Sequence, residues 1–262
     1  MLNRKEIALQ IAEKIASNES ILKQQYLESK DDIGFFFIDD LLSTELANQI
    51  FENFPKLSEA KKKNDFREQK YVAYQMNKYH PILEEVIYAF QEQDVVNIIS
   101  KIVANDTILP DSNLYAGGLS LMAKNNFLSP HLDNSHDKDI KLWRVFNLLY
   151  YVTPNWKLEN GGNLELWPNG LKSNPITIES KCNRLVVMAT HQKSWHSVNK
   201  VLTDGVRCCV SNYYFSGSPL LSSDSFHVTT FRGRPSQKAR DFVLQIDNSL
   251  RNTLRKLFKK GL

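Results

Sequence analysis

A series of short apolar runs, divided by turns, fills the second half of the chain and constrains its fold more than any other feature. Turn sequences such as Asn160-Gly161-Gly162 and Asp204-Gly205 separate the runs. Short strands at this cadence, with glycine and asparagine in the turns, are typical of a β-sandwich or a jelly roll. The expected strands cover about residues 115–123, 127–133, 142–153, 162–167, 175–180, 184–190, 195–201, 206–216 and 226–232.

Helices are expected on both sides of this β region. Apolar residues recur at helical spacing within residues 4–28, as at Ile7 and Ile11. A short aromatic strand at 33–40 precedes a helix that Ser43 caps and Pro55 ends. Residues 81–104 predict two helices, or one helix with a break near residues 93–94.

The last helix begins after Arg234-Pro235 and carries a long apolar stripe. This stripe predicts packing on the sheet or on a second copy of the protein, so a homodimer is compatible with the sequence. With 262 residues and 42% apolar content, the chain suits a single α+β domain with a mainly β core. Its expected parts are a helical N-terminal support region with a short strand (1–110), the β core (111–234) and the C-terminal helix (235–262).

Residues 56–80 are polar and rich in lysine, including Lys61-Lys62-Lys63. A long segment of this kind is commonly a mobile loop or a lid. The tyrosines in its second half predict either a substrate entrance or partly buried packing; they are Tyr71, Tyr74 and Tyr79.

Composition excludes several classes of protein. The net charge of +4 has no aromatic-basic repeat beside it, which argues against a nucleic-acid partner. Three cysteines form neither a disulfide framework nor a metal knuckle, which suits a reducing compartment. The sequence shows no signal-peptide pattern and no apolar run near the roughly 18 residues of a membrane span. We therefore expect a cytoplasmic protein without stable membrane insertion.

His131 and Asp133 form the strongest candidate for a metal site. Two residues apart in an extended segment, they point to the same face of a strand. A second histidine from a neighbouring strand would complete two histidines and one carboxylate, the set typical of non-haem Fe(II) oxygenases. His136 and His191 lie in polar turns, whereas His196 begins an apolar strand, so we favour His196 as the third ligand.

The motifs around these residues resemble the Fe(II)/2-oxoglutarate-dependent dioxygenase superfamily, in particular its prolyl-hydroxylase-like branch. The ordered pieces are His131-Leu132-Asp133, Tyr150-Tyr151 followed by Trp156, Gly161-Gly162 before a strand, Arg184-Leu185 leading a strand, and the pair His196 and Arg207. The resemblance covers about residues 115–217 and implies a double-stranded β-helix, which is a jelly roll. It also implies Fe(II), 2-oxoglutarate and O2 as cofactor and cosubstrates, with ascorbate as a candidate reductant.

By this resemblance His131, Asp133 and His196 ligate the iron, and Arg207 and Tyr151 bind the far carboxylate of 2-oxoglutarate. Arginine suits this task because its planar fork contacts a carboxylate through two hydrogen bonds. Asn147 shares a strand face with Val145 and Tyr151, which predicts a contact to the cosubstrate or to a ligand. Tyr151 as a core tyrosine and Asn147 as a satisfied buried amide are the structural alternatives.

Three features depart from the family pattern or extend it. The interval from His196 to Arg207 is about two residues longer than in the relatives, which implies a longer turn at 200–205. Leu119, Leu121 and Met122 stand where relatives often place another cosubstrate-binding tyrosine, and Tyr115 is a candidate substitute. The residues expected to border a substrate pocket are Trp143, Trp195, Arg232 and Arg234.

The resemblance predicts an enzyme that hydroxylates an unactivated C–H bond and releases succinate and CO2. Its substrate would be a prolyl residue, an amino acid or another small metabolite. Asp133 argues against halogenating relatives, in which a small residue at this place leaves a coordination site for chloride. The alternative is a non-catalytic, cupin-like protein that binds a metal or ligand, or acts as a sensor.

Overall fold

The apolar runs pair into one curled antiparallel sheet. The computed structural model describes residues 2–115 and 117–257, and thirteen strands within them belong to this sheet. Their bounds are β1 Phe35–Ile38, β2 Lys61–Asn64, β3 Glu68–Ala73, β4 Ile108–Pro110, β5 Gly118–Met122, β6 Phe127–Leu132, β7 Trp143–Tyr151, β8 Leu164–Leu166, β9 Ile176–Ile178, β10 Arg184–Ala189, β11 His196–Val198, β12 Arg207–Ser216 and β13 Thr230–Phe231.

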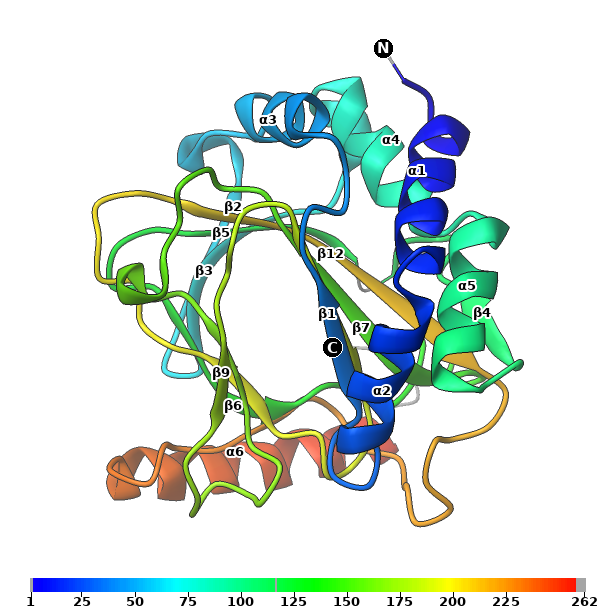
Figure 1. Cartoon of the computed structure of the whole chain (residues 1–262). Coiled ribbons are helices and arrows are strands. Elements are labelled where there is room, and N and C mark those ends of the chain that lie inside the picture. Colours follow the sequence, from blue (N-terminus) through cyan, green and yellow to red (C-terminus); the bar gives the residue numbers. More distant parts are fainter. Residues whose placement is uncertain (1, 116, 258–262) are drawn as a thin grey trace.

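Ten strands follow one another across the sheet in the order β1-β10-β7-β12-β5-β3-β6-β11-β8-β9. The remaining three extend it, since β2 pairs with β3, β4 with β12, and β13 with β6. The sheet curls round on itself, as Figure 1 shows. This is the predicted mainly β jelly roll, and every strand expected between residues 115 and 232 is present.

Helices precede the first strand, alternate with β1–β4 and follow the last strand (Figure 1). Six α-helices are described: α1 Arg4–Ala16, α2 Glu19–Ser29, α3 Thr44–Glu52, α4 Pro81–Ala89, α5 Gln93–Val103 and α6 Lys238–Leu257, with short 3-10 turns at Leu57–Glu59, Met76–Lys78 and Leu158–Asn160. The helix expected over 4–28 is interrupted at Ser17 and Asn18, because both side chains bind the Lys14 carbonyl and replace continuing helical bonds. Ser43 caps α3 as predicted, by accepting from the Leu46 amide.

The N-terminal helices cover the outer face of the strands that carry the interior. Ile7, Ile11 and Ile15 of α1 are fully buried in one cluster with Phe146 and Val210 of β7 and β12. Burying an aliphatic side chain of this size stabilises a fold by about 1.5–3 kcal/mol. The helices therefore stabilise the outer face of the sheet by apolar packing, while its inner face surrounds a cavity.

The segment 56–80 folds differently from its prediction. Most of it is a hairpin of β2 and β3, and β3 pairs with both β5 and β6 inside the sheet. The prediction of a mobile loop is wrong. The segment is polar because its residues face a cavity rather than an apolar core, and not because it lacks strands. Tyr71 packs against the core and the Tyr79 hydroxyl donates to the Glu59 carbonyl, whereas Tyr74 lines a side cavity.

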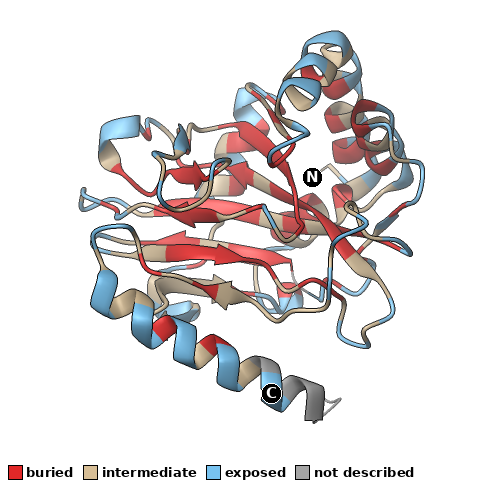
Figure 2. Cartoon of the chain, turned by 90° about the horizontal axis from the view of Figure 1, so that it is seen from below, coloured by how far each residue is buried: buried red, intermediate tan, exposed pale blue. Residues whose placement is uncertain are grey.

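The apolar stripe of α6 faces away from the sheet, so the first of its two predicted alternatives, packing on the sheet, is wrong. Phe242, Ile246 and Leu250 are 66%, 48% and 60% exposed, and Figure 2 shows α6 along the rim with mostly exposed residues. The inner face of the helix carries buried Leu244 and Asn248, and polar contacts hold it to the sheet. A homodimer through the stripe stays a prediction. Within the described residues, no helix is both long and apolar enough to span a bilayer.

Candidate metal and cosubstrate site

The inner face of the curled sheet surrounds a cavity of about 600 Å³. Most of its wall comes from β3, β5, β6, β7, β11 and β12, and part comes from β13 and α6. All six candidate residues from the sequence line it: His131, Asp133, Asn147, Tyr151, His196 and Arg207. Strands far apart in the sequence thus bring these side chains to one place.

His131, Asp133 and His196 converge at one end of this cavity. His196 of β11 is the direct cross-strand partner of His131 in β6, and Asp133 follows the end of β6. The Nε2 atoms of His131 and His196 lie 3.6 and 3.7 Å from the two carboxylate oxygens of Asp133. One ligand atom from each of the three residues lies within 4.8 Å of those from the other two. One ion can therefore contact all three.

Hydrogen bonds orient both imidazoles toward the shared centre. His131 Nδ1 lies 3.0 Å from the Ser129 carbonyl, and His196 Nδ1 lies 2.9 Å from the Ser194 carbonyl. A carbonyl only accepts, so Nδ1 carries the proton and the Nε2 lone pair of each ring is left for a metal. This tautomer is the one that metal-binding histidines commonly adopt.

The local electrostatics favour the metal-binding protonation states. Burial, and then the neighbouring His131, lower the pKa of His196 to about 4, so its ring is neutral at pH 7. Burial acts to raise the pKa of Asp133, but His196, His131 and Arg144 outweigh burial and hold that pKa far below its usual value. Two neutral imidazoles and one carboxylate are the donors that suit Fe(II).

The two rival histidines lie elsewhere. His136 packs against Trp143 with tilted rings whose centroids lie 4.0 Å apart, and its Nδ1 contacts the Ser135 hydroxyl. His191 contacts the Ile33 carbonyl through Nε2, so that ring is fixed against the start of β1. Among the described residues, neither histidine belongs to a group that could hold a metal ion.

Arg207 is a buried cation without a carboxylate partner. It is 4% exposed, none of the described acidic side chains lies within ion-pair distance of it, and its Nε has no hydrogen-bond partner. Its Nη2 points to the sulfur of Met122, which is a weak acceptor. Tyr151 lies beside it, with the ring centroid 5.3 Å from the guanidinium. A buried guanidinium in this state is suited to a carboxylate ligand, because an unpaired buried charge is costly.

Asn147 and Arg144 both approach Asp133 from β7. The Asn147 amide donates to Asp133 Oδ2 at 3.3 Å, while its own buried oxygen has no partner. Arg144 Nη1 lies 3.9 Å from Asp133 Oδ1, and its guanidinium covers the Tyr213 ring at 4.2 Å. Arg144 was absent from the sequence prediction, and Val145, predicted on the Asn147 face, is instead buried in the outer core.

These observations fit both groups that such a site would hold. The three-residue donor set fits a divalent metal, with cavity volume left on its open side. The orphaned Nε of Arg207 fits the second carboxylate of a dicarboxylic acid that reaches from the metal into the cavity. Tyr115 also lines the cavity and is 42% exposed.

The four residues expected to border a substrate pocket do not line this cavity. Arg232 and Arg234 form ion pairs with Asp241 and Glu165. Trp143 packs on His136, and Trp195 lies outside the cavity wall. Residues of the β2–β3 hairpin, β13 and α6 line part of the cavity instead.

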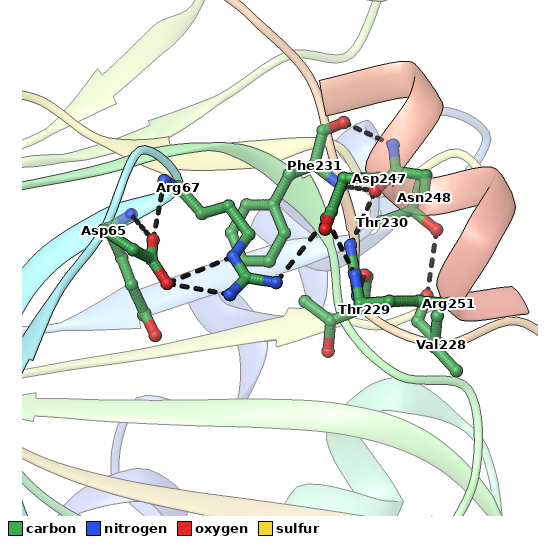
Figure 3. Close-up of polar contacts among 10 residues, drawn as sticks. Asp65, Arg67, Val228, Thr229, Thr230, Phe231, Asp247, Asn248 and Arg251 are labelled. Atoms are coloured by element: carbon green, nitrogen blue, oxygen red, sulfur yellow. Dashed lines mark hydrogen bonds and ion pairs between the residues drawn. The ribbon is translucent and has the colours of Figure 1, made fainter. Parts of the chain in front are cut away.

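Phe231 of β13 lines the cavity beside His131. Its ring stacks on His131, with centroids 5.3 Å apart. Figure 3 shows how α6 holds it: the Asn248 side chain donates to the Phe231 carbonyl and accepts from the Phe231 amide. Asp247 joins Arg251 to Arg67 of the hairpin, at 2.8 and 3.5 Å. The C-terminal helix is therefore part of the site architecture.

Comparison with known proteins identifies the core. Residues 117–215 match the family model of the 2OG-Fe(II) oxygenase superfamily. The jelly-roll core belongs to that superfamily. By this match the core is that of a 2-oxoglutarate-dependent oxygenase, a superfamily that uses Fe(II), 2-oxoglutarate and O2. A search of curated proteins found no match.

Solved structures share the fold of this chain at low sequence identity. A prolyl hydroxylase from Trichoplax adhaerens, in complex with a hypoxia inducible factor peptide fragment, is 18% identical with a TM-score of 0.55; the match covers 77% of this chain and 92% of that one. A prolyl 4-hydroxylase from Phytophthora capsici is 18% identical with a TM-score of 0.59, covering 95% and 77%. HygX from Streptomyces hygroscopicus, with nickel, 2-oxoglutarate and hygromycin B bound, is 12% identical with a TM-score of 0.50, covering 78% and 88%.

Proposed function

We propose that this oxygenase is a hydroxylase in which His131, Asp133 and His196 hold Fe(II), and Arg207 and Tyr151 hold the far carboxylate of 2-oxoglutarate. One observation carries the proposal. The metal-binding triad and an unpaired buried arginine line the same cavity. A protein that only stores or senses a metal has no need of the second feature, so the non-catalytic alternative is disfavoured.

Each residue has a distinct task in this proposal. His131 and His196 offer Nε2 to the metal because the Nδ1–H group of each ring donates to a backbone carbonyl. Asp133 supplies a negative charge, and Asn147 orients that carboxylate by donating to it. Arg207 and Tyr151 anchor the keto acid in a place with little water. When bound, iron, 2-oxoglutarate and O2 would supply the oxidising chemistry: one oxygen atom of O2 enters the succinate, which is released with CO2, and the other enters the hydroxylated product.

The proposed reaction is hydroxylation of an unactivated C–H bond in a prolyl residue, an amino acid or another small metabolite. Hydroxylation is favoured over halogenation because Asp133 occupies the coordination position that a halide would need. Two of the similar structures are named prolyl hydroxylases, and a third holds hygromycin B, a small molecule. The cavity has room for a substrate of either kind beside the keto acid.

Metal binding tests the first half of the proposal. Anaerobic titration with Fe(II), or with Mn(II) as a stable substitute, should show one site per chain in the native protein. His131→Ala and His196→Ala should weaken it by roughly 100-fold or more, since each removes a ligand. His136→Ala is the matched control, and thermal unfolding checks that each variant is folded. Unchanged metal content in His131→Ala would overturn the assignment.

Cosubstrate binding tests the second half. Calorimetry with the Mn(II) protein should detect 2-oxoglutarate, and Arg207→Met should weaken this binding roughly 10- to 100-fold because a charge-assisted contact is lost. Tyr151→Phe should have a smaller effect. Substrate-dependent release of succinate in a metabolite and peptide screen would then identify the substrate class.

A further inference from the structure

The β2–β3 hairpin places two lysines opposite each other in the wall of the cavity. Lys63 of β2 is the cross-strand partner of Lys70 in β3. Of the three consecutive lysines in β2, Lys61 and Lys62 are exposed and Lys63 is partly buried. Cβ atoms of opposed residues lie about 5 Å apart, and like charges at this spacing destabilise a hairpin. The opposed lysines therefore lower the stability of the hairpin, and its strand pairing does not require them.

The surrounding acidic groups do not fully neutralise this pair. Glu68 approaches Lys70, with Nζ and Oε2 2.8 Å apart. Among the described residues, no carboxylate lies within ion-pair distance of Lys63. The arginines of the same wall differ, because Arg67 and Arg251 are matched by carboxylates on the hairpin and on α6. Positive charge is therefore left at Lys63, facing the cavity.

The lysine pair also stands where two cavities meet. Besides the metal cavity, a side cavity of about 300 Å³ is lined by the same two lysines. Four hydroxyl-bearing residues line both spaces as well: Tyr115, Ser120, Ser211 and Tyr213. Ammonium and hydroxyl groups are the donors that bind carboxylate and phosphate oxygens.

We propose that Lys63 and Lys70 form an anion subsite beside the metal centre, and that the substrate of this oxygenase carries a carboxylate or phosphate group that binds there. That the bound anion is part of a substrate rests on the function proposed above, whereas anion binding at the two lysines does not. Arg207 is a separate anchor, because it is buried on β12 and lies beside Tyr151. The subsite accounts for the opposed lysines, since a bound anion converts their repulsion into attraction.

Small anions test the subsite without knowledge of the substrate. Mn(II) protein is saturated with 2-oxoglutarate under anaerobic conditions, so that Arg207 is occupied. Inorganic phosphate and acetate are then titrated, and paramagnetic relaxation of ³¹P and of the acetate methyl protons reports binding near the metal. We expect saturable binding of at least one probe, and the difference between them separates phosphate from carboxylate preference.

Variants locate the binding. The double variant Lys63→Gln with Lys70→Gln should raise the dissociation constant of the anion about tenfold, because contacts with charged donors are lost. Lys61→Gln with Lys62→Gln removes the same charge from exposed positions of the same hairpin and should change the constant less than twofold. Lys63→Gln alone should not lower the unfolding midpoint, because it removes a repulsion; a merely structural lysine would give a lower midpoint.

The outcomes are separable from those of the proposed function. If Mn(II) does not bind, the proposed function fails, and anion binding is followed instead by amide chemical shifts of Lys63, Lys70 and their neighbours. Three results would overturn the subsite: neither probe binds, the probes bind equally to the double variant, or a further excess of 2-oxoglutarate above saturation displaces them fully.

Discussion

Removal of the Asn248 side chain should detach the C-terminal helix from the wall of the metal cavity. Its carboxamide accepts from the Phe231 amide at 2.9 Å and donates to the Phe231 carbonyl at 2.6 Å. A third contact comes from Arg251 Nη2, at 2.7 Å. Asn248 and Phe231 are 6% and 7% exposed, so Asn248→Ala leaves two buried backbone groups without partners.

The size of the effect follows from those two groups. A buried backbone group without a hydrogen bond costs about 1–3 kcal/mol. Two of them cost about 2–6 kcal/mol, and water entering from the helix side reduces this toward the lower value. Alanine favours a helix by about 0.5 kcal/mol over asparagine, which offsets a small part. We therefore expect the free energy of unfolding to fall by about 2–3 kcal/mol, or the docking of α6 to weaken by that amount.

Urea denaturation and amide hydrogen exchange together measure this loss. If α6 undocks before the sheet unfolds, exchange of the Phe231 amide accelerates roughly 30- to 100-fold while the global midpoint changes little. Ser249→Ala, at an exposed neighbour on the same helix, is the matched control and should change stability by less than about 0.5 kcal/mol. A loss below 1 kcal/mol by both measurements would contradict the role of Asn248.

Two further predictions concern a turn and a buried histidine. Gly161→Ala should destabilise the protein by at least about 2 kcal/mol more than Gly170→Ala in urea denaturation. Both glycines have positive φ, but of the two only Gly161 lies where a Cβ would collide with a backbone atom, the Lys200 carbonyl oxygen. Burial lowers the pKa of His191, so the unfolded chain takes up a proton more readily and stability should fall as pH drops below about 6.5. His191→Gln should flatten this part of the unfolding profile between pH 5 and 7, and an unchanged slope would count against it.

Local periodicity explains why much of the core could be predicted. Alternation within 127–133 places His131 and Asp133 on one face because a strand has a period of two, and no tertiary contact is needed for that inference. His196 could be selected since it begins an apolar run, whereas His191 lies in a turn. Which strand faces His196 is a long-range matter, and the family resemblance supplied it.

Arg144 shows where this reasoning fails. Along β7, Phe146 pairs with Tyr214, but Arg144 pairs with Phe215, so Val145 is an extra residue in the ladder. This β-bulge turns Arg144 to the cavity side and Val145 to the outer core. Strict alternation predicts the opposite for both residues. A bulge depends on the partner strand, and the sequence of β7 alone does not reveal it.

The hairpin at 61–73 was missed for a related reason. Strand prediction relies on apolar alternation, and β2 consists of three lysines and an asparagine. Its pairing depends on β3, whose cavity-facing residues are charged because they surround a polar space. Polar strands of this kind look like loops in the sequence, although their position in the sheet makes them part of the site.

The C-terminal helix separates two properties that an amphipathic pattern usually joins. Such a pattern identifies the apolar face of a helix, and in most proteins that face is also the docked one. In α6 the docked face is mainly polar: besides Leu244, its contacts include those of Asn248 and Arg251 and the ion pairs of Asp241 and Asp247. Hydrogen bonds and partly exposed ion pairs give weaker docking than apolar burial, and salt screens the ionic part. Because α6 fixes Phe231 against His131, raised salt should loosen this wall of the site before it affects the apolar packing of α1, α4 and α5.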